Sequence, residues 1–496
     1  MKHYHDTINK RSRLIDAPVI GSNSGTAALA AFDPKALKHR IASALRIQND
    51  YFPCFDWTFP PPITPKSRAP VNAMALFSEP TVVCGRYSIY AHVPFCASLC
   101  KFCYYPVIPG SHEDEMQRYV DYLLREMAAY APALEHSRCE SVYIGGGTPT
   151  YLGDRLLQRL LDGIHRNFRF TEDAEVSIES APGTIPRDRL ALLLGLGVNR
   201  VSYGIQSLDS AMLAGLNRNY SVPAAIVEIS QAVEIIGNVN VDTMYGFEGE
   251  ADGALAGTLS QLIRLGVPGL SIYSLDSQRS DHDRVRFLPA RDEHHERKLA
   301  IFRHARQLLD QEGFEPVLQN IFIRPGRASF RHQLRRWENV PLVALGISSM
   351  GYAPRALYQN HLGLKNYYRS LDEGQLPVLE TERITPELEM ARELVSQLRF
   401  TAVNVRHIDE KYGVDVQAIY RDLISALSEL GYLEVHKGTL RLAEEAAAYN
   451  NIIPMLFAPD AFKQTLFDLP EEYREQFPLP FVLTQVGATQ NRPIGI

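Results

Sequence analysis

Short apolar runs alternate with amphipathic stretches along the middle of the chain. The runs are rich in Val, Ile and Tyr and are bounded by Gly, Pro or Asp, a pattern typical of buried strands. The stretches between them place apolar residues at spacings of three and four, which predicts helices with one buried face. The predicted strands are 87–93, 141–146, 174–180, 198–205, 239–246 and 269–275. The predicted helices include 113–134, 154–168 and 292–313.

This alternation predicts an α/β fold built on a parallel sheet. Parallel strands need crossover connections, and helical crossovers cover the faces of the sheet. Six strand–helix units are fewer than the eight of a complete barrel, so we expect an open, partial (β/α)6 barrel. Ligands of such sheets bind beyond the carboxyl ends of the strands, and we expect the functional residues there.

The pattern changes after the predicted barrel. Residues 386–398 and 415–430 have helical periodicity, whereas 432–443 alternate around Lys437–Gly438 as a hairpin does. Helices followed by a hairpin predict a winged-helix-like α+β domain. We expect this domain to be a structural lid rather than a DNA-binding module, because it carries no basic stripe.

The 496 residues are therefore divided into four parts. Residues 1–86 have weak periodicity and a Pro-rich patch, and are predicted to be an N-terminal accessory segment. Residues 87–380 are the predicted partial barrel, and 381–450 the winged-helix-like domain. A tail follows over 451–496. We expect the two terminal segments and the loop 276–291 to shape the substrate pocket.

The charge and the hydropathy exclude several classes of protein. The net charge is −6 and no long run of like charges occurs, so no footprint for nucleic acid is present. No window approaches 18 consecutive apolar residues, and the N-terminus lacks the apolar core of a signal peptide. We expect a soluble, cytoplasmic protein that binds neither nucleic acid nor membrane. Its oligomeric state is not predicted.

Three of the six cysteines lie close together, at 96, 100 and 103, directly after the first predicted strand. A structural zinc site takes four closed ligands. A cube of four irons held by three cysteines instead leaves one iron free to bind a substrate or cosubstrate. The spacing therefore favours an iron–sulfur cluster over zinc. The other cysteines are scattered and are predicted to be small, half-buried apolar side chains: Cys54, Cys84 and Cys139.

Further polar groups fall at or just after the predicted strand ends. The glycine-rich stretch 145–149 would let its backbone approach a ligand closely, although a plain tight turn has the same composition. Glu179, Gln206, Arg218 and Asp242 offer carboxylates, an amide and a cation that suit ribose hydroxyls and a zwitterion. A helix cap or a surface ion pair would explain any one of them. The ordered set favours binding.

These stretches resemble a known family. The spacing C-x3-C-x2-C on a loop after a strand resembles the signature of the radical S-adenosylmethionine (SAM) superfamily. The stretch YAHVPFCASLCKFC resembles the oxygen-independent coproporphyrinogen III oxidase family. The likeness continues, more weakly, through 322–352 and the winged-helix-like domain. The other matching stretches are YIGGGTPTYL (143–152), SIESAPGTI (177–185), NRVSYGIQSLDSAMLAGLNR (199–218) and NVDTMYGFEGE (240–250).

The resemblance implies a cofactor set. Cys96, Cys100 and Cys103 would hold a [4Fe-4S] cluster that cleaves SAM to a 5′-deoxyadenosyl radical, and two SAM molecules lie side by side in the family's best-known members. It also implies a small-molecule substrate and an external one-electron reductant of the flavodoxin or ferredoxin type. The positions that match SAM-binding residues of the family are Tyr90, Gly146, Gly147, Thr148, Glu179, Gln206, Arg218, Asp242 and Met244.

Three functions fit this resemblance. Methyl or methylene transfer from a second SAM to an sp² carbon is favoured, because family oxidases usually carry a fourth cysteine where Tyr105 stands here. Their N-terminal motif rich in arginine and tyrosine is also not matched. Oxidation of coproporphyrinogen III is the alternative. A haem chaperone is the third, since His332 and Trp337 resemble its H-N-x4-W stretch, with Gln333 replacing the asparagine. A lone histidine beside arginines is more often hydrogen-bonded than a haem ligand.

Overall fold

The computed structural model describes most of the predicted barrel and of the domain that follows it. Nearly all of the predicted accessory segment and tail, the whole of loop 276–291, and Cys54 and Cys84 lie outside the described residues. The described residues are 38, 66–77, 85–103, 105–247, 249–275, 292–318, 320–400, 402–444, 446 and 453–458.

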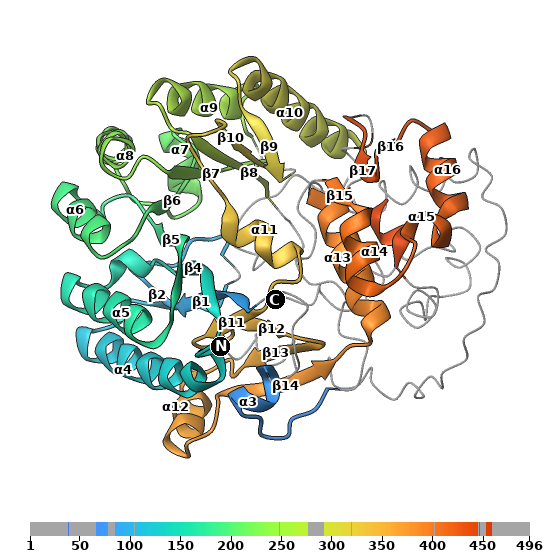
Figure 1. The fold of residues 1–496 in the computed structure, drawn as a ribbon. Coiled ribbons are helices and arrows are strands. Elements are labelled where there is room, and N and C mark those ends of the chain that lie inside the picture. Colours follow the sequence, from blue (N-terminus) through green and yellow to red (C-terminus); the bar gives the residue numbers. More distant parts are fainter. Residues whose placement is uncertain are drawn as a thin grey trace.

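A twelve-stranded sheet forms the body of the molecule, in the order β14-β13-β12-β11-β1-β4-β5-β6-β7-β8-β10-β9 (Figure 1). Its six central strands are parallel, and each matches one predicted strand. The predicted parallel α/β fold is confirmed. The edge strands β14 and β9 are not paired with each other, so the sheet stays open. The central strands are β1 (Arg86–Val93), β4 (Arg138–Gly146), β5 (Phe170–Ser180), β6 (Arg200–Gln206), β7 (Val239–Tyr245) and β8 (Gly269–Ser274).

Helices cover the outer face of this sheet (Figure 1). Their apolar stripes are buried: Leu156, Leu160 and Ile164 of α5, for example, are fully shielded from solvent. The predicted helix 113–134 ends earlier, at Tyr130, because Pro132 follows and the chain tightens into the 3-10 turn η2 (Ala131–Leu134). The helices are α4 (Glu113–Tyr130), α5 (Asp154–Asn167), α6 (Arg187–Gly195), α7 (Ser210–Gly215), α8 (Val222–Ile235), α9 (Ala254–Arg264) and α10 (Asp292–Gln311).

Six short strands extend the sheet on both sides and were not predicted. β11 lies parallel to β1 and is followed by an antiparallel meander, while β10 and β9 extend the other side. These strands are β9 (Glu315–Leu318), β10 (Ile321–Ile323), β11 (Leu342–Leu345), β12 (Met350–Ala353), β13 (Ala356–Asn360) and β14 (Val378–Arg383). The accompanying helices are α3 (Ala73–Phe77), α11 (Arg331–Trp337) and α12 (Leu364–Asp372).

The C-terminal elements pack around a second core that includes Leu394, Leu427 and Leu440. The predicted hairpin is present, with Lys437 and Gly438 both at positive φ in its turn. The predicted helix 415–430 is broken at Tyr420. The elements are α13 (Pro386–Phe400), β15 (Ala402–Asn404), α14 (Val405–Tyr412), α15 (Val416–Ile419), α16 (Arg421–Glu429), β16 (Leu433–His436), β17 (Thr439–Leu442) and η5 (Pro454–Phe457).

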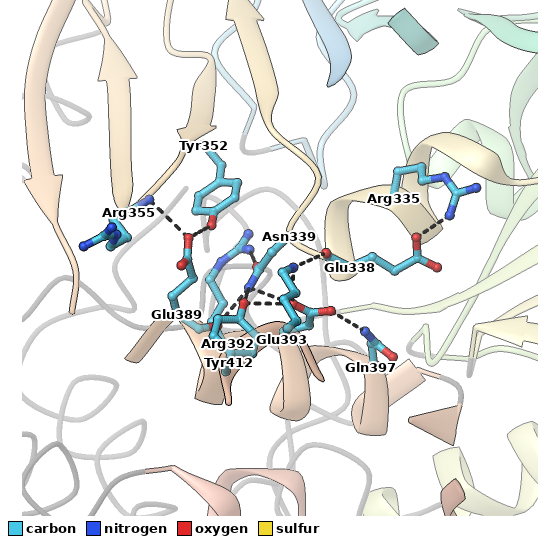
Figure 2. Close-up of polar contacts among 11 residues, drawn as sticks. Arg335, Glu338, Asn339, Tyr352, Arg355, Glu389, Arg392, Glu393, Gln397 and Tyr412 are labelled. Carbon is cyan, nitrogen blue, oxygen red and sulfur yellow. Dashed lines mark hydrogen bonds and ion pairs between the residues drawn. The ribbon is translucent and has the colours of Figure 1, made fainter. Parts of the chain in front are cut away.

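A buried polar cluster joins this C-terminal unit to the barrel (Figure 2). Glu393 of α13 is fully buried and forms an ion pair with Lys411 of α14, at 2.6 Å. Asn339, which precedes β11, accepts from Arg392 and donates to the carbonyl of Glu389 at 2.8 Å. The junction is therefore held by charged hydrogen bonds. Across the described ranges, no helix is both long enough and apolar enough to cross a membrane.

Candidate functional site

The three clustered cysteines lie on a loop that is closed at its base. Cys96 ends the short strand β2 (Phe95–Cys96), which pairs with β3 (Ile108–Pro109), so both ends of residues 96–107, the cysteine loop, are tied together. The amide of Cys103 donates to the carbonyl of Cys100 at 3.1 Å. All three thiols are free and partly exposed. The loop thus presents them from one compact turn at the carboxyl end of β1.

Burial changes the acidity of two of these thiols. It raises the pKa of Cys96 to about 11 and that of Cys103 to about 12, and the neighbouring cysteines contribute to the rise. These two thiols are therefore protonated at neutral pH, and binding a metal centre must release their protons. Within the described part of the chain, no three His, Cys, Asp or Glu side chains converge closely enough to hold a single metal ion. A [4Fe-4S] cluster is larger and binds each thiolate at a different iron.

Arg218 connects the cysteine loop to the end of β6. Its Nη1 lies 3.3 Å from Cys100 Sγ, and its Nη2 donates to the carbonyl of Gly204. Gln206 ends the same strand at a φ of 70°, and a Cβ at Gly204 would lie 3.1 Å from its Nε2. The side-chain amide of Asn217 donates to the carbonyl of Leu99, in the cysteine loop, at 2.8 Å. The cation and the amide predicted for the site thus meet beside Cys100.

The glycine-rich turn after β4 packs directly against the same loop. The amide of Gly147 donates to Val93 O at 2.9 Å, and the amide of Thr148 donates to Phe95 O at 2.8 Å. Thr148 Oγ1 lies 3.7 Å from Cys96 Sγ. A Cβ on Gly147 would lie only 2.9 Å from that sulfur and 2.7 Å from Phe95 O. The turn therefore needs glycine so that its backbone can reach the thiol.

Replacing Gly147 by alanine is expected to lower the iron content of the reconstituted protein several-fold. The added methyl would collide with backbone atoms of Phe95 and with Cys96 Sγ, so the loop must shift. Iron and sulfide analysis after anaerobic reconstitution measures this. Gly257→Ala is the control, because its Cβ would meet nothing within 4 Å. Equal iron content in the two variants would contradict the packing argument.

Glu179 lies at the end of β5 and binds the other side of the glycine turn. It accepts from Tyr143 OH at 2.6 Å and from the amide of Gly146 at 2.9 Å. Burial raises its pKa to about 7, so near neutral pH the carboxyl is poised between its two forms. The ring of Tyr90 stacks on Tyr143 with centroids 6.2 Å apart. Glu179 and Tyr90 thus share one wall of the barrel interior.

Asp242 and Met244 lie on β7, across the interior. Asp242 accepts from Ser202 Oγ at 3.2 Å and from Asn240 Nδ2 at 2.8 Å, and burial raises the pKa of its carboxyl. Met244 is buried in a small apolar cluster against which Phe102 of the cysteine loop packs. The Cys96 thiol interacts electrostatically with Glu179, and Glu179 with Asp242. The residues predicted for SAM binding therefore converge around the cysteine loop, and their contact with SAM stays a prediction.

The site can be compared with known proteins. Residues 90–262 match the Radical SAM superfamily and residues 384–449 the HemN C-terminal domain. The heme chaperone HemW of Escherichia coli K12 is 30% identical over 271 residues, which cover 53% of this chain and 69% of that protein. The chain belongs to the HemN/HemW family of radical SAM proteins. Membership implies a [4Fe-4S] cluster and SAM, as the cysteine spacing predicted.

Other relatives in the HemN/HemW family carry two kinds of name. The heme chaperone HemW of Bacillus subtilis is 25% identical over 376 residues, covering 73% of this chain and 97% of that protein. The oxygen-independent coproporphyrinogen III oxidase of Salmonella typhimurium is 27% identical over 384 residues, covering 71% of this chain and 83% of that protein. These names agree better with the predicted alternatives, oxidation and haem binding, than with methyl transfer, which no relative named here supports.

A solved structure extends this likeness to the fold. Coproporphyrinogen III oxidase (HemN) from Escherichia coli, a radical SAM enzyme, aligns with a TM-score of 0.67 and 24% identity. The alignment covers 78% of this chain and 92% of that one. The parallel-sheet radical SAM fold with its HemN C-terminal domain is therefore shared.

The side chain of His332 is not free to bind haem iron. It is 3% exposed, its Nδ1 lies 3.1 Å from Ser141 Oγ, and its ring packs on Tyr143. Burial lowers its pKa to about 3, so the ring is neutral. The hydrogen-bonded interpretation of this histidine is the one that the structure supports. Haem ligation by His332 would require α11 to open.

Sequence reasoning missed His92, whose ring contacts Tyr90, the cysteine loop and the glycine-rich turn. Its Nε2 lies 3.0 Å from Pro106 O, and its Nδ1 lies 3.0 Å from Tyr90 OH. A carbonyl only accepts, so Nε2 carries the hydrogen and Nδ1 accepts from the tyrosine. A Cβ on Gly146 would lie 2.5 Å from the ring. The available signal was its position two residues after Tyr90, on the same face of β1.

Proposed function

We propose that this radical SAM enzyme cleaves SAM reductively and oxidises a propionate side chain of coproporphyrinogen III or a closely related substrate. The observation that carries the SAM-cleavage part of the proposal is the convergence of the three thiols, the glycine turn, Arg218 and Glu179 on one face. A bound [4Fe-4S] cluster would supply the electron that breaks the SAM carbon–sulfur bond. Oxidase-named relatives that match most of the chain support the substrate class.

The residues of the chain have separable tasks in this proposal. Cys96, Cys100 and Cys103 would hold the cluster, and Arg218 offsets the negative charge of the thiolates. The backbone of the glycine turn and an ionised Glu179 can accept from a SAM ammonium group. The buried strands around them exclude water from a reactive radical.

Four further expectations belong to this proposal. A second SAM binds beside the first, and an external one-electron reductant of the flavodoxin or ferredoxin type supplies the electron. The accessory segment 1–86 and the tail 451–496 help to shape the pocket. The division at 87–380 and 381–450 separates the radical chemistry from the lid.

Methyl or methylene transfer is the second candidate, and one observation favours it. Tyr105, which is 45% exposed, stands where family oxidases usually have a fourth cysteine. A second SAM would then donate carbon, and its product would be S-adenosylhomocysteine.

One experiment separates these functions. The protein is reconstituted anaerobically with iron and sulfide, then incubated with SAM and dithionite, with and without coproporphyrinogen III. We expect 5′-deoxyadenosine, with carbon dioxide and a vinyl-bearing product only when the porphyrinogen is present. S-Adenosylhomocysteine together with 5′-deoxyadenosine would instead support methyl transfer. An intact cluster without either nucleoside, but with stoichiometric haem binding, would overturn both in favour of a chaperone.

A further inference from the structure

Gln206 ends β6 in a strained and irregular stretch of backbone. Its φ is 70°, in the left-handed region that residues other than glycine seldom adopt. The register between β6 and β7 shifts at the same point, between Gly204 and Gln206, as it does where a strand carries an extra residue. Such conformations persist only where the surrounding structure holds them in place. The contacts that hold the backbone at Gln206 therefore bear on the site.

The hydroxyl of Tyr220 binds the backbone on both sides of Gln206. It donates to the carbonyl of Ile205 at 2.5 Å and to that of Ser207 at 3.0 Å, so one hydrogen is shared between two acceptors. Ile205 and Ser207 are both buried, and a buried carbonyl that loses its donor is costly. The hydroxyl thus fixes the two peptide groups that flank the strained residue.

Tyr220 reaches the end of β6 from the segment between α7 and α8. The next residue, Ser221, caps α8 by accepting from the amide of Ala224 at 3.5 Å. Three residues before Tyr220, the side chain of Asn217 donates to the carbonyl of Leu99 in the cysteine loop at 2.8 Å. The segment is therefore anchored to a helix on one side of Tyr220 and to the cysteine loop on the other.

The ring of Tyr220 lies beside a second polar group of the site. The Cζ atom of Arg218 is 5.8 Å from the ring centroid, within the range of a cation–π contact, and its Nη1 is 3.3 Å from Cys100 Sγ. A Cβ on Gly204 would lie 3.1 Å from Gln206 Nε2 and 3.4 Å from Arg218 Nη2. The amide of Gln206 and the guanidinium of Arg218 therefore lie together over Gly204, and Tyr220 contacts the backbone of one and the side chain of the other.

We propose that Tyr220 is a positioning residue of the SAM site, whose hydroxyl holds the backbone around Gln206 so that the Gln206 amide faces SAM. The inference rests on the proposed function, because it takes Gln206 as a contact of SAM. Tyr220 itself contacts neither SAM nor the cluster in this proposal. Its hydroxyl acts through Gln206, whereas its ring packs against Arg218 beside the cluster.

The test measures SAM binding to anaerobically reconstituted protein by equilibrium dialysis, with iron content and thermal unfolding as parallel readouts. Tyr220→Phe removes only the hydroxyl and keeps the ring beside Arg218, so the variant should load as much iron as the unchanged protein. Its affinity for SAM should fall about tenfold, the effect of losing roughly one hydrogen bond to the ligand.

Tyr420→Phe is the matched control for this substitution. Tyr420 also donates its hydroxyl to a backbone carbonyl, that of Phe457 at 2.6 Å, but it lies in the C-terminal unit. Tyr420→Phe should keep the affinity for SAM within about twofold of that of the unchanged protein, because distant sites act independently.

A double-mutant cycle separates positioning from a general structural role. Gln206→Gly removes the amide and adopts positive φ without strain, so nothing is left for the hydroxyl to aim. If Tyr220 acts through Gln206, adding Tyr220→Phe to Gln206→Gly should change the affinity for SAM by less than about twofold. A further loss of about tenfold in the Gln206→Gly background would contradict the proposal. This comparison also decides the matter where Tyr220→Phe alone does not fold, because glycine relieves the strain at position 206.

The remaining outcomes are equally distinct. A folded Tyr220→Phe variant that binds SAM as tightly as the unchanged protein would overturn the inference and leave the proposed function intact. A folded Tyr220→Phe variant that fails to load iron would show that the hydroxyl supports the cysteine loop instead of Gln206, which also overturns the inference. An unchanged protein that loads iron but binds no SAM would overturn the proposed function, and the inference with it.

Discussion

Replacing Cys96, Cys100 and Cys103 together by alanine is expected to abolish cluster binding and to reduce 5′-deoxyadenosine formation to background. The three thiols are the soft ligands on a loop closed by β2 and β3, and no other thiol interacts with them in the described structure. Anaerobic reconstitution followed by iron analysis and absorbance at about 400 nm, where Fe–S charge transfer is expected, measures the loss.

Cys139→Ala is the matched control for this experiment. Cys139 is fully buried at the start of β4, and its thiol donates to the carbonyl of Ser141 at 3.2 Å. The Cys139→Ala variant should therefore keep the cluster, and any effect of the substitution should be a lower free energy of unfolding. A triple variant that retains a full complement of iron would show that the cluster is bound elsewhere.

The fold was predictable where its signals are local. The six parallel strands are apolar and bounded by turn residues, so their periodicity could be read directly. The strands β9 to β14 span only three to six residues each. β11 owes its place to pairing with β1, more than two hundred residues earlier in the chain. Short runs held by distant partners carry no local pattern, and they were missed.

The site was predictable where polar residues end strands. Glu179, Gln206 and Asp242 interrupt apolar runs near the carboxyl edge of the sheet, where ligands bind. His92 lies near the carboxyl end of β1 as well, but its role comes from its contacts and not from its position alone, so it was passed over. Its place became visible only from its hydrogen bonds to Tyr90 and Pro106 and from the glycine that packs on its ring.

The reaction was harder to predict than the cofactor. Three cysteines and a glycine turn are required by SAM cleavage whatever the substrate. Substrate choice depends on side chains that follow no fixed spacing. The sequence favoured methyl transfer because Tyr105 replaces a cysteine, whereas the named relatives are oxidases and haem chaperones. Oxidation is therefore the first reaction to test.

Replacing Lys411 by methionine is expected to lower the free energy of unfolding by about 3–5 kcal/mol, the usual cost of removing one partner from a buried ion pair. Lys411 Nζ lies 2.6 Å from Glu393, and the side chains are 7% and 0% exposed. The variant leaves the Glu393 carboxylate buried without its cation, at the junction drawn in Figure 2. Chemical denaturation followed by circular dichroism measures the loss.

The pH dependence and two variants make this prediction specific. Burial already raises the pKa of Glu393, and removing Lys411 must raise it further. A carboxyl group whose pKa is higher in the folded than in the unfolded protein binds its proton more tightly in the folded state. The destabilisation caused by Lys411→Met should therefore shrink as the pH falls below the folded-state pKa of Glu393. Arg125→Met, which breaks an exposed pair with Asp372, should cost at most about 1 kcal/mol. Lys411→Met with Glu393→Met should be more stable than Lys411→Met alone, because the buried carboxylate that lost its cation is removed as well. If the double variant is no more stable, the cost arises from lost packing and the ion pair does not hold the junction.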